Sequence, residues 1–180
     1  NVRTVHDTGL TADEHRQIAD LVRATWPEKP GVPLPPALAA SKRSNWRPVQ
    51  DHVLVMDGDT LIAHAATFPK TLLVGGGELE VLGLAAVCVR KDRRGGGFGR
   101  QAVKQALKPV DEGRYSVVLF QTAVPDFYRK LGAVEIANPF RNSTDRIAPD
   151  ASPWWDPHVM IYPDWPGWPE DPIDLNGPGY

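Results

Sequence analysis

The segment VCVRKDRRGGGFGRQAV, residues 87–103, joins an apolar strand pattern to a helical pattern through a charged, glycine-rich loop. Residues 90–94 contain four cationic side chains, and residues 95–99 contain four glycines. Glycine loses more backbone entropy on folding than other residues, and adjacent like charges repel each other. In return, successive glycines free backbone N–H groups, and a helix N-terminus adds partial positive charge. The segment therefore predicts a phosphate or pyrophosphate site, and nearby full charges come from Lys91, Arg93, Arg94 and Arg100.

Composition limits what else the protein can be. A chain of 180 residues most simply forms one domain with a full core. A formal net charge of −2 argues against nucleic acid as the main partner. Cys88 is the only cysteine, which excludes an intrachain disulfide and a cysteine metal cluster. Without an apolar run of membrane length or a signal pattern, we expect a cytoplasmic protein with no membrane partner; its oligomeric state stays open, a homodimer being one option.

The remaining sequence alternates strand and helix patterns. Strands are expected at 2–6, 52–56, 60–68, 71–74, 78–89, 115–121, 133–136 and 158–162. Helices are expected between Thr11 and Pro27, at 98–110 and at 124–132, whereas 27–48 is proline-rich and predicts a long loop with at most one short helix. Tight turns at 57–59 and 75–77 make the central strands an antiparallel meander. This order predicts a mixed α/β fold with one sheet layer and helices on its faces.

Several kinds of site can contain a glycine-rich loop. A nucleotide-binding P-loop needs Gly-Lys-Ser/Thr after its glycines, and residues 95–103 lack that sequence. Residues 97–102 fit the Rossmann pattern G-x-G-x-x-A, but charged residues separate them from their strand, and the next strand ends in Gln121 rather than an acid. A charged surface loop at a sharp turn is the non-functional alternative.

Two motifs resemble those of the GNAT acyltransferases. Residues 94–99, RGGGFG, match the family's Gln/Arg-x-x-Gly-x-Gly/Ala signature, and FYRKLGA at 127–133 resembles its FYxKLGF segment. The resemblance covers about residues 2–137. It implies a GNAT-type mixed α/β fold, with a mostly antiparallel central sheet flanked by helices and splayed between the fourth and fifth strands. We expect residues 1–180 to form a single acetyltransferase domain, with 141–180 as a Pro/Trp-rich acidic extension of it.

The resemblance also implies a function, acetyl-CoA-dependent transfer of an acetyl group to a primary amine by direct attack in a ternary complex. Tyr128 corresponds to the tyrosine that usually protonates the departing thiolate, and a strand N–H near Val87 is expected to bind the oxyanion. The implied coenzyme A residues are Val87, Cys88, Val89, Arg94, Gly95, Gly96, Gly97, Phe98, Gly99 and Arg100. We expect no metal, and a buried, unreactive thiol at Cys88.

The general base is the open point. Many relatives carry a glutamate in the central strand a few residues before the position of Val87, where this sequence has Gly83, Leu84, Ala85 and Ala86; the glutamate of aminoglycoside 2'-N-acetyltransferases aligns with Ala85. The nearest acids in that strand are Glu80, which we select as the candidate, and Glu78; a β-bulge would be needed to turn either toward the site. His64, a polar residue in an apolar strand, and a water chain are the alternatives, with His52 and His158 as weaker candidates.

The acceptor is expected to be a small, cationic amine. The stretch LIAHAA at 61–66, the glycine turn after it and the long C-terminal segment resemble aminoglycoside 2'-N-acetyltransferases. Residues 141–180 contain seven acids, two arginines and four tryptophans, a composition that would attract and stack against a polycation. Their eight prolines exceed what those enzymes carry. The missing glutamate keeps a second class of function open, a non-catalytic acyl-CoA-binding protein or sensor.

Overall fold

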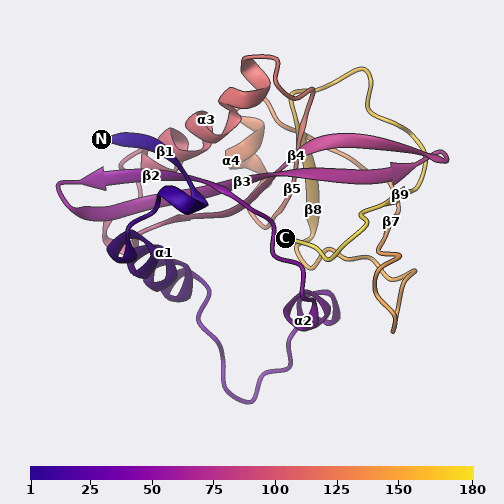
Figure 1. Ribbon diagram of the computed structural model, residues 1–180, viewed down its shortest axis with the longest axis horizontal. Coiled ribbons are helices and arrows are strands. Elements are labelled where there is room, and N and C mark those ends of the chain that lie inside the picture. The colour runs from indigo at the N-terminus through magenta and orange to yellow at the C-terminus, as the bar shows by residue number, and fades with distance from the viewer.

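A computed structural model describes residues 1–180, which form a nine-stranded sheet with helices on both faces (Figure 1). The strands are β1 Val2–His6, β2 Asp51–Asp57, β3 Thr60–Val74, β4 Gly77–Val89, β5 Val118–Thr122, β6 Val134–Glu135, β7 Phe140–Arg141, β8 His158–Tyr162 and β9 Ile173–Asp174. The helices are α1 Ala12–Thr25, α2 Pro36–Arg43, α3 Phe98–Asp111 and α4 Pro125–Arg129, with 3-10 turns at Asp7–Gly9 and Lys91–Arg93. None of the helices is both long and apolar enough to cross a bilayer.

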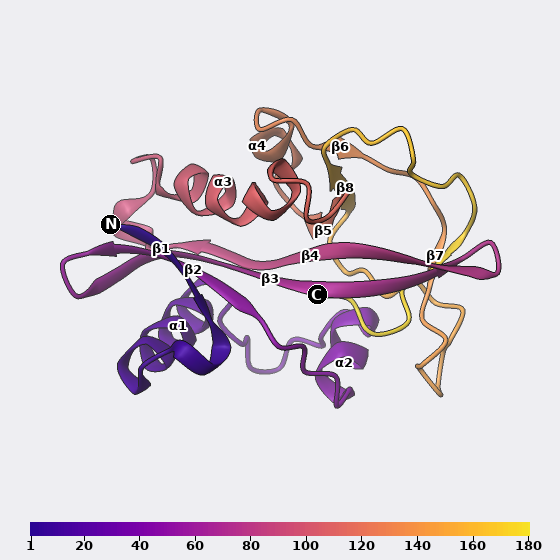
Figure 2. The same cartoon turned by 45° about the horizontal axis from the view of Figure 1, so that its top comes forward.

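The sheet order is β1-β2-β3-β4-β5-β8-β6, and β9 pairs with both β3 and β7. All neighbouring strands are antiparallel except β4 with β5 and β7 with β9. The expected mixed α/β fold with a mostly antiparallel sheet is therefore confirmed. Figure 2 shows α3 and α4 on one face of the sheet and α1 and α2 on the other.

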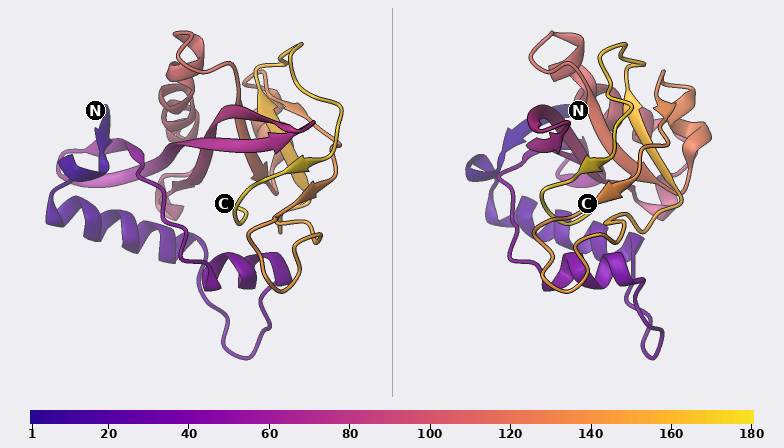
Figure 3. Two further views of the ribbon diagram at one scale, coloured as in Figure 1. Left: turned by 45° about the vertical axis from the view of Figure 1, so that its right-hand side comes forward. Right: turned by 90° about the vertical axis from the view of Figure 1, so that its right-hand side faces the viewer.

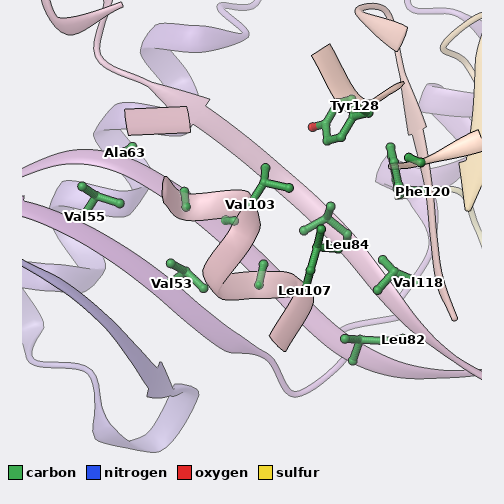
Figure 4. Packing of buried hydrophobic residues seen from close by; sticks show 14 of the residues in the cluster. Val53, Val55, Ala63, Leu82, Leu84, Val103, Leu107, Val118, Phe120 and Tyr128 are labelled. Atoms are coloured by element: carbon green, nitrogen blue, oxygen red, sulfur yellow. The ribbon is translucent and has the colours of Figure 1, made fainter. Parts of the chain in front are cut away.

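The main core lies between the sheet and α3. The small and branched residues on the inner face of α3 are fully buried; they are Ala102, Val103, Ala106 and Leu107. They pack on β2, β3 and β4 through residues such as Val53, Ala63 and Leu84 (Figure 4). On the opposite face, α1 begins with a capping box in which Thr11 and Glu14 satisfy each other's backbone N–H groups. Both helices were expected from local sequence, and both form where expected.

The long β3–β4 hairpin differs from the expectation in one respect. The sequence indicated two strands, 60–68 and 71–74, but β3 is one strand that runs through Pro69. The pairing of β2 with β3 ends at Thr67, so the backbone on that side of Pro69 has no strand partner. Proline has no backbone N–H, but no neighbouring strand lies on that side of Pro69 to accept a hydrogen bond from one.

The sheet opens between β4 and β5, as expected. These strands pair only at Leu82 with Val118 and at Gly83 with Leu119. Beyond Gly83, the edge of β4 that faces away from β3 has no β5 partner. This unpaired part of β4 leads into the glycine-rich loop, which follows the end of the strand.

Residues 141–180 pack onto the sheet rather than extending away from it. The strand β8 inserts between β5 and β6, and β9 pairs with the tip of the β3–β4 hairpin. Figure 2 and Figure 3 show the C-terminal residues returning under the sheet on the side that carries α2, while the loop between α1 and α2 projects away from the body. The two-residue strands β7 and β9 were not expected, because neither has a periodic pattern of its own.

Candidate active site

A β-bulge in β4 lies where the sheet opens. His64 is opposite Cys88 and Ala66 is opposite Ala85, so Ala86 and Val87 together face the single residue between them on β3. Ala86 has a positive φ of 51°, a conformation that non-glycine residues rarely adopt. The three residues 85–87 are half-buried, although the four before them are buried. A bulge at this place turns main-chain groups of β4 out of the regular ladder and toward the open gap.

The glycine-rich loop has the geometry of an anion cradle. Gly95 and Gly97 have positive φ angles of 84° and 78°, and a Cβ atom at either position would project into open space. Gly97 is also the N-cap of α3, and no side chain caps that helix. The first N–H groups of α3 are therefore available to an external acceptor.

The two sequence motifs meet at Gly99. A Cβ atom on Gly99 would lie 3.2 Å from Val89 Cγ2 of β4 and 3.7 Å from Phe127 Cζ of α4. Glycine at this position allows α3 to approach both elements closely. The neighbouring Phe98 ring lies over Gly96, whose added Cβ would be 2.7 Å from the ring. The loop, the end of β4 and the start of α4 thus form one continuous region.

Only some of the cations around this loop are free for an anion. Arg93 forms an ion pair with Asp57 at 2.9 Å, which corrects the expectation that its charge serves the loop. Arg94 Nε donates to the carbonyl of Val89 at 3.3 Å, so its guanidinium lies beside the end of β4. Lys91 and Arg100 are exposed and form no ion pair. Arg94, Lys91 and Arg100 are therefore the cations near the loop that no carboxylate neutralises.

Tyr128 is buried on α4, with its ring centroid 4.5 Å from that of Phe120 and 4.9 Å from that of Phe127. Figure 4 shows its hydroxyl oxygen directed away from Phe120. Burial raises the pKa of Tyr128 above the ordinary value of 10.0, and the negative charge of Asp156 raises it further. The phenol therefore stays protonated at neutral pH and can donate a proton.

Cys88 belongs to β4, and its thiol is buried on the face of the sheet that carries α1. Burial raises its pKa to about 12, although the hydroxyl of Thr25 and the charge of Arg94 act in the opposite direction. Its Sγ lies 3.5 Å from the carbonyl oxygen of Ala86. A thiol with this pKa remains protonated, which fits the expected unreactive role.

The structure does not bring Glu80 to the site. Its carboxylate is exposed and accepts a hydrogen bond from Thr71 Oγ1 at 3.1 Å. It lies roughly 20 Å of extended strand from Val87, and the bulge in β4 is at Ala86, beyond the reach of Glu80 and Glu78 alike. Among the histidines, His158 lies near the surface with Glu135, at 2.7 Å, whereas His64 and His52 are buried beside the bulge.

Asp156 is a candidate site residue that the sequence alone did not single out. It is half-buried, and its backbone N–H donates to Gln121 Oε1 at 2.8 Å at the end of β5. Burial raises the pKa of its carboxyl group, and the carboxylate in turn raises the pKa of Tyr128. The acidic composition of residues 141–180 indicated a carboxylate near the acceptor but gave no means of choosing among seven acids.

Comparisons with known proteins agree with this geometry. Residues 8–136 match the family model described as an acetyltransferase (GNAT) domain, whereas no curated protein sequence matches the chain. Escherichia coli ElaA has a similar structure, with a TM-score of 0.59 at 16% identity over 89% of this chain and 97% of that one. A GNAT family acetyltransferase from Brucella melitensis, solved in complex with acetyl-CoA, gives 0.59 at 15% identity over 96% and 94%.

A third similar structure is an acyl-CoA N-acyltransferase from Pseudomonas aeruginosa, with a TM-score of 0.57 at 16% identity over 89% of this chain and 97% of that one. At such identities the structural likeness shows the fold alone. The family model spans more than half of the chain and includes the bulge, the glycine-rich loop and Tyr128. The chain therefore belongs to the GNAT acetyltransferase family.

Proposed function

We propose that this acyltransferase moves an acetyl group from acetyl-CoA to a primary amine of a small cationic acceptor, by direct attack in a ternary complex. The observation that carries the proposal is the shared position of three features: the β4 bulge at Ala86, the uncapped glycine-rich loop and the Tyr128 phenol. Residues 1–180 act as a single acetyltransferase domain in this proposal, and residues 141–180 contribute part of the acceptor site.

The residues present fit coenzyme A. The N–H groups of the loop and of the first turn of α3 would bind the pyrophosphate, assisted by Arg94 and Arg100. The positive φ angles and the open space at Gly95 and Gly97 leave room for phosphate oxygens close to the backbone. The unpaired edge of β4 at 87–89 would hydrogen-bond the pantetheine arm. When bound, the cofactor supplies the thioester that the amine attacks.

Three groups of this chain would assist the transfer. A main-chain N–H at the bulge, near Val87, would donate to the oxygen that becomes negatively charged during attack. Tyr128, which is protonated at neutral pH, would donate its phenolic proton to the departing sulfur, and the phenolate would regain a proton from the nitrogen that has attacked the thioester. Asp156 would attract the ammonium form of the acceptor and take up a proton, since burial raises the pKa of its carboxyl group. We propose Asp156 for this role ahead of Glu80, which is exposed and bonded to Thr71.

A cationic acceptor agrees with the charge of the C-terminal segment. Residues 141–180 contain seven acids and two arginines. Aminoglycosides are one acceptor class with the required charge. Acetylation of a 2'-amino aminoglycoside but not of its 2'-hydroxy counterpart would support that class, and equal or absent acetylation of both would remove it.

Replacing Tyr128 by phenylalanine tests the proposal. We expect turnover on a panel of amines to fall about 100-fold or more, with the dissociation constant for acetyl-CoA unchanged in calorimetry. Tyr115→Phe is the control, because Tyr115 packs on the same core but follows the far end of α3.

Micromolar acetyl-CoA binding without turnover on any amine would instead favour a non-catalytic acyl-CoA sensor, for which the lack of a glutamate at residues 83–86 is the supporting observation. Binding of neither acetyl-CoA nor coenzyme A would contradict both functions.

A further inference from the structure

Three side chains form a continuous hydrogen-bonded chain from the surface to the β4 bulge. Asp7 Oδ1 lies 2.6 Å from His52 Nε2, and His52 Nδ1 lies 2.9 Å from His64 Nε2. His64 Nδ1 in turn lies 2.9 Å from the carbonyl oxygen of Ala86. The side chain of Asp7 is 34% exposed, whereas His52 and His64 are buried, so the chain connects solvent to the bulge across β2 and β3.

The direction of each hydrogen bond follows from its end points. The Ala86 carbonyl can only accept, so His64 Nδ1 must carry a proton. His64 Nε2 must then accept from His52 Nδ1 unless His64 is a cation, and burial together with the His52 charge lowers the pKa of His64 to about 4. His52 Nε2 faces a carboxylate oxygen and must also donate. In this arrangement both ring nitrogens of His52 face acceptors, and His64 accepts at Nε2 and donates at Nδ1.

The surroundings of the chain support this arrangement. Burial tends to raise the pKa of Asp7, but hydrogen bonds from the Gln50 backbone N–H and from His52 bring it below its ordinary value, with a further contribution from the charge of His6. Asp7 is therefore a carboxylate at neutral pH. At the other end, the Cys88 thiol is protonated and lies 3.5 Å from the same Ala86 carbonyl. No acid faces His64, so its proton stays on the nitrogen that faces Ala86.

The bulge needs an anchor because its backbone is strained. Ala86 has a φ of 51°, a left-handed conformation in which the Cβ of an L-residue crowds the following carbonyl oxygen. No β5 strand pairs with this part of β4, so regular sheet bonds support the bulge on one side only. A buried N–H group aimed at the Ala86 carbonyl supplies the missing support at the place where the strain lies.

We infer that His64, oriented by His52 and Asp7, is a positioning residue that holds the β4 bulge in the conformation required for acetyl transfer. The inference rests on the proposed function, because it assigns the bulge N–H to the reacting oxygen. The Asp7–His52–His64 chain thus supports the backbone of the bulge, a role that differs from those proposed for the glycine-rich loop and Tyr128.

Two substitutions at one position separate positioning from simple packing. The amide nitrogen of asparagine can replace His64 Nδ1, whereas the amide of glutamine reaches the position of Nε2. His64→Asn therefore keeps the donor to Ala86, and His64→Gln keeps only the contact with His52. Both remove the same buried ring. His15 lies on the exposed face of α1, so His15→Asn is the control for the effect of replacing a histidine by asparagine away from the bulge.

We expect His64→Gln to lower kcat at least about tenfold more than His64→Asn does, with similar KM values for acetyl-CoA and similar melting temperatures for the two variants. Equal kcat values for the two variants would overturn the inference.

Nitrogen NMR of histidine-labelled protein provides a readout that does not depend on turnover. The wild-type protein should show His64 as the Nδ1–H tautomer, and the Val87 amide resonance should move in His64→Gln but much less in His64→Asn. An Nε2–H tautomer at His64, or an unmoved Val87 amide in both variants, would overturn the inference. If the wild-type protein acetylates no amine, the proposed function fails, and the NMR result still decides whether His64 holds the bulge.

Discussion

The side-chain amide of Gln121 donates from Nε2 to the main-chain oxygen of Tyr180 at 2.8 Å, although 59 residues separate the two. The Oε1 atom of the same amide accepts the backbone N–H groups of Trp155 and Asp156, at 2.9 and 2.8 Å. Tyr180 Oη returns a hydrogen bond to the Leu119 carbonyl. Residue Gln121 at the end of β5 thus ties two distant parts of the C-terminal segment to the edge of the proposed acceptor site.

Replacing Gln121 by alanine should loosen that edge. Loss of the amide leaves three partly buried main-chain groups without partners, so we expect the free energy of unfolding to fall by about 1–3 kcal/mol. The KM for the amine should rise because Asp156 is no longer held, while acetyl-CoA affinity stays the same. Denaturation and steady-state kinetics would measure both. Gln105→Ala is the control, since Gln105 makes one exposed hydrogen bond, to Thr4; an equal effect of both variants on the amine KM would contradict the assignment.

Replacing Asp156 by asparagine tests the proposed acceptor contact. A half-buried carboxylate that binds an ammonium group contributes about 1.5–3 kcal/mol, so the KM for a cationic amine should rise about tenfold or more. Because the Asp156 charge raises the pKa of Tyr128, that pKa should also move down toward its ordinary value, as tyrosine absorbance titration would report. Asp164→Asn, an exposed acid in the same segment, should change neither quantity.

Replacing Gly97 by alanine tests the anion cradle separately from backbone strain. Gly97 and Gly113 have φ angles of 78° and 75°, and a Cβ atom at either would meet open space. Alanine at either position should therefore destabilise the protein by a similar amount, about 1 kcal/mol. Only Gly97→Ala should also weaken acetyl-CoA binding, because its Cβ enters the space next to the free N–H groups of α3. Equal affinities in calorimetry for the two variants would argue against the cradle.

Local signals in the sequence predicted the elements that depend on neighbouring residues. The Thr11 cap, the glycine turns and the apolar face of α3 act within a few residues, and the corresponding helices and hairpins form as expected. Motif recognition similarly placed the loop and Tyr128 in one region.

Contacts between distant residues were not predictable in the same way. The neighbours that give Asp156 and His64 their significance are Gln121 and Ala86, which lie 35 and 22 residues away in the chain. Glu80 shows the opposite error, because its position in the right strand suggested a base, but strand geometry leaves it at the exposed end of the hairpin. Sheet register decides both cases, and no short pattern reports it.

Lys70 on β3 gives a last prediction, about stability and pH. Its ammonium group is buried, donates to the Asn176 carbonyl at 3.0 Å and lies 4.8 Å from the Trp46 ring centroid. Burial lowers its pKa from 10.5 to about 8, although the charge of Asp174 acts in the opposite direction. Between these two values the unfolded chain binds more protons than the folded protein, so folding stability rises with pH.

Lys70→Met removes this titration and keeps the apolar stem. The free energy of unfolding of the wild-type protein, relative to that of the variant, should therefore increase by roughly 2–3 kcal/mol as the pH rises from 8 toward 10.5. Because the buried tyrosines and Cys88 are common to both proteins, their titration cancels in the difference. Urea denaturation of both proteins across this range measures it. A difference that is constant with pH would mean that Lys70 ionises in the folded protein as it does in the unfolded chain, and that its burial carries no electrostatic penalty.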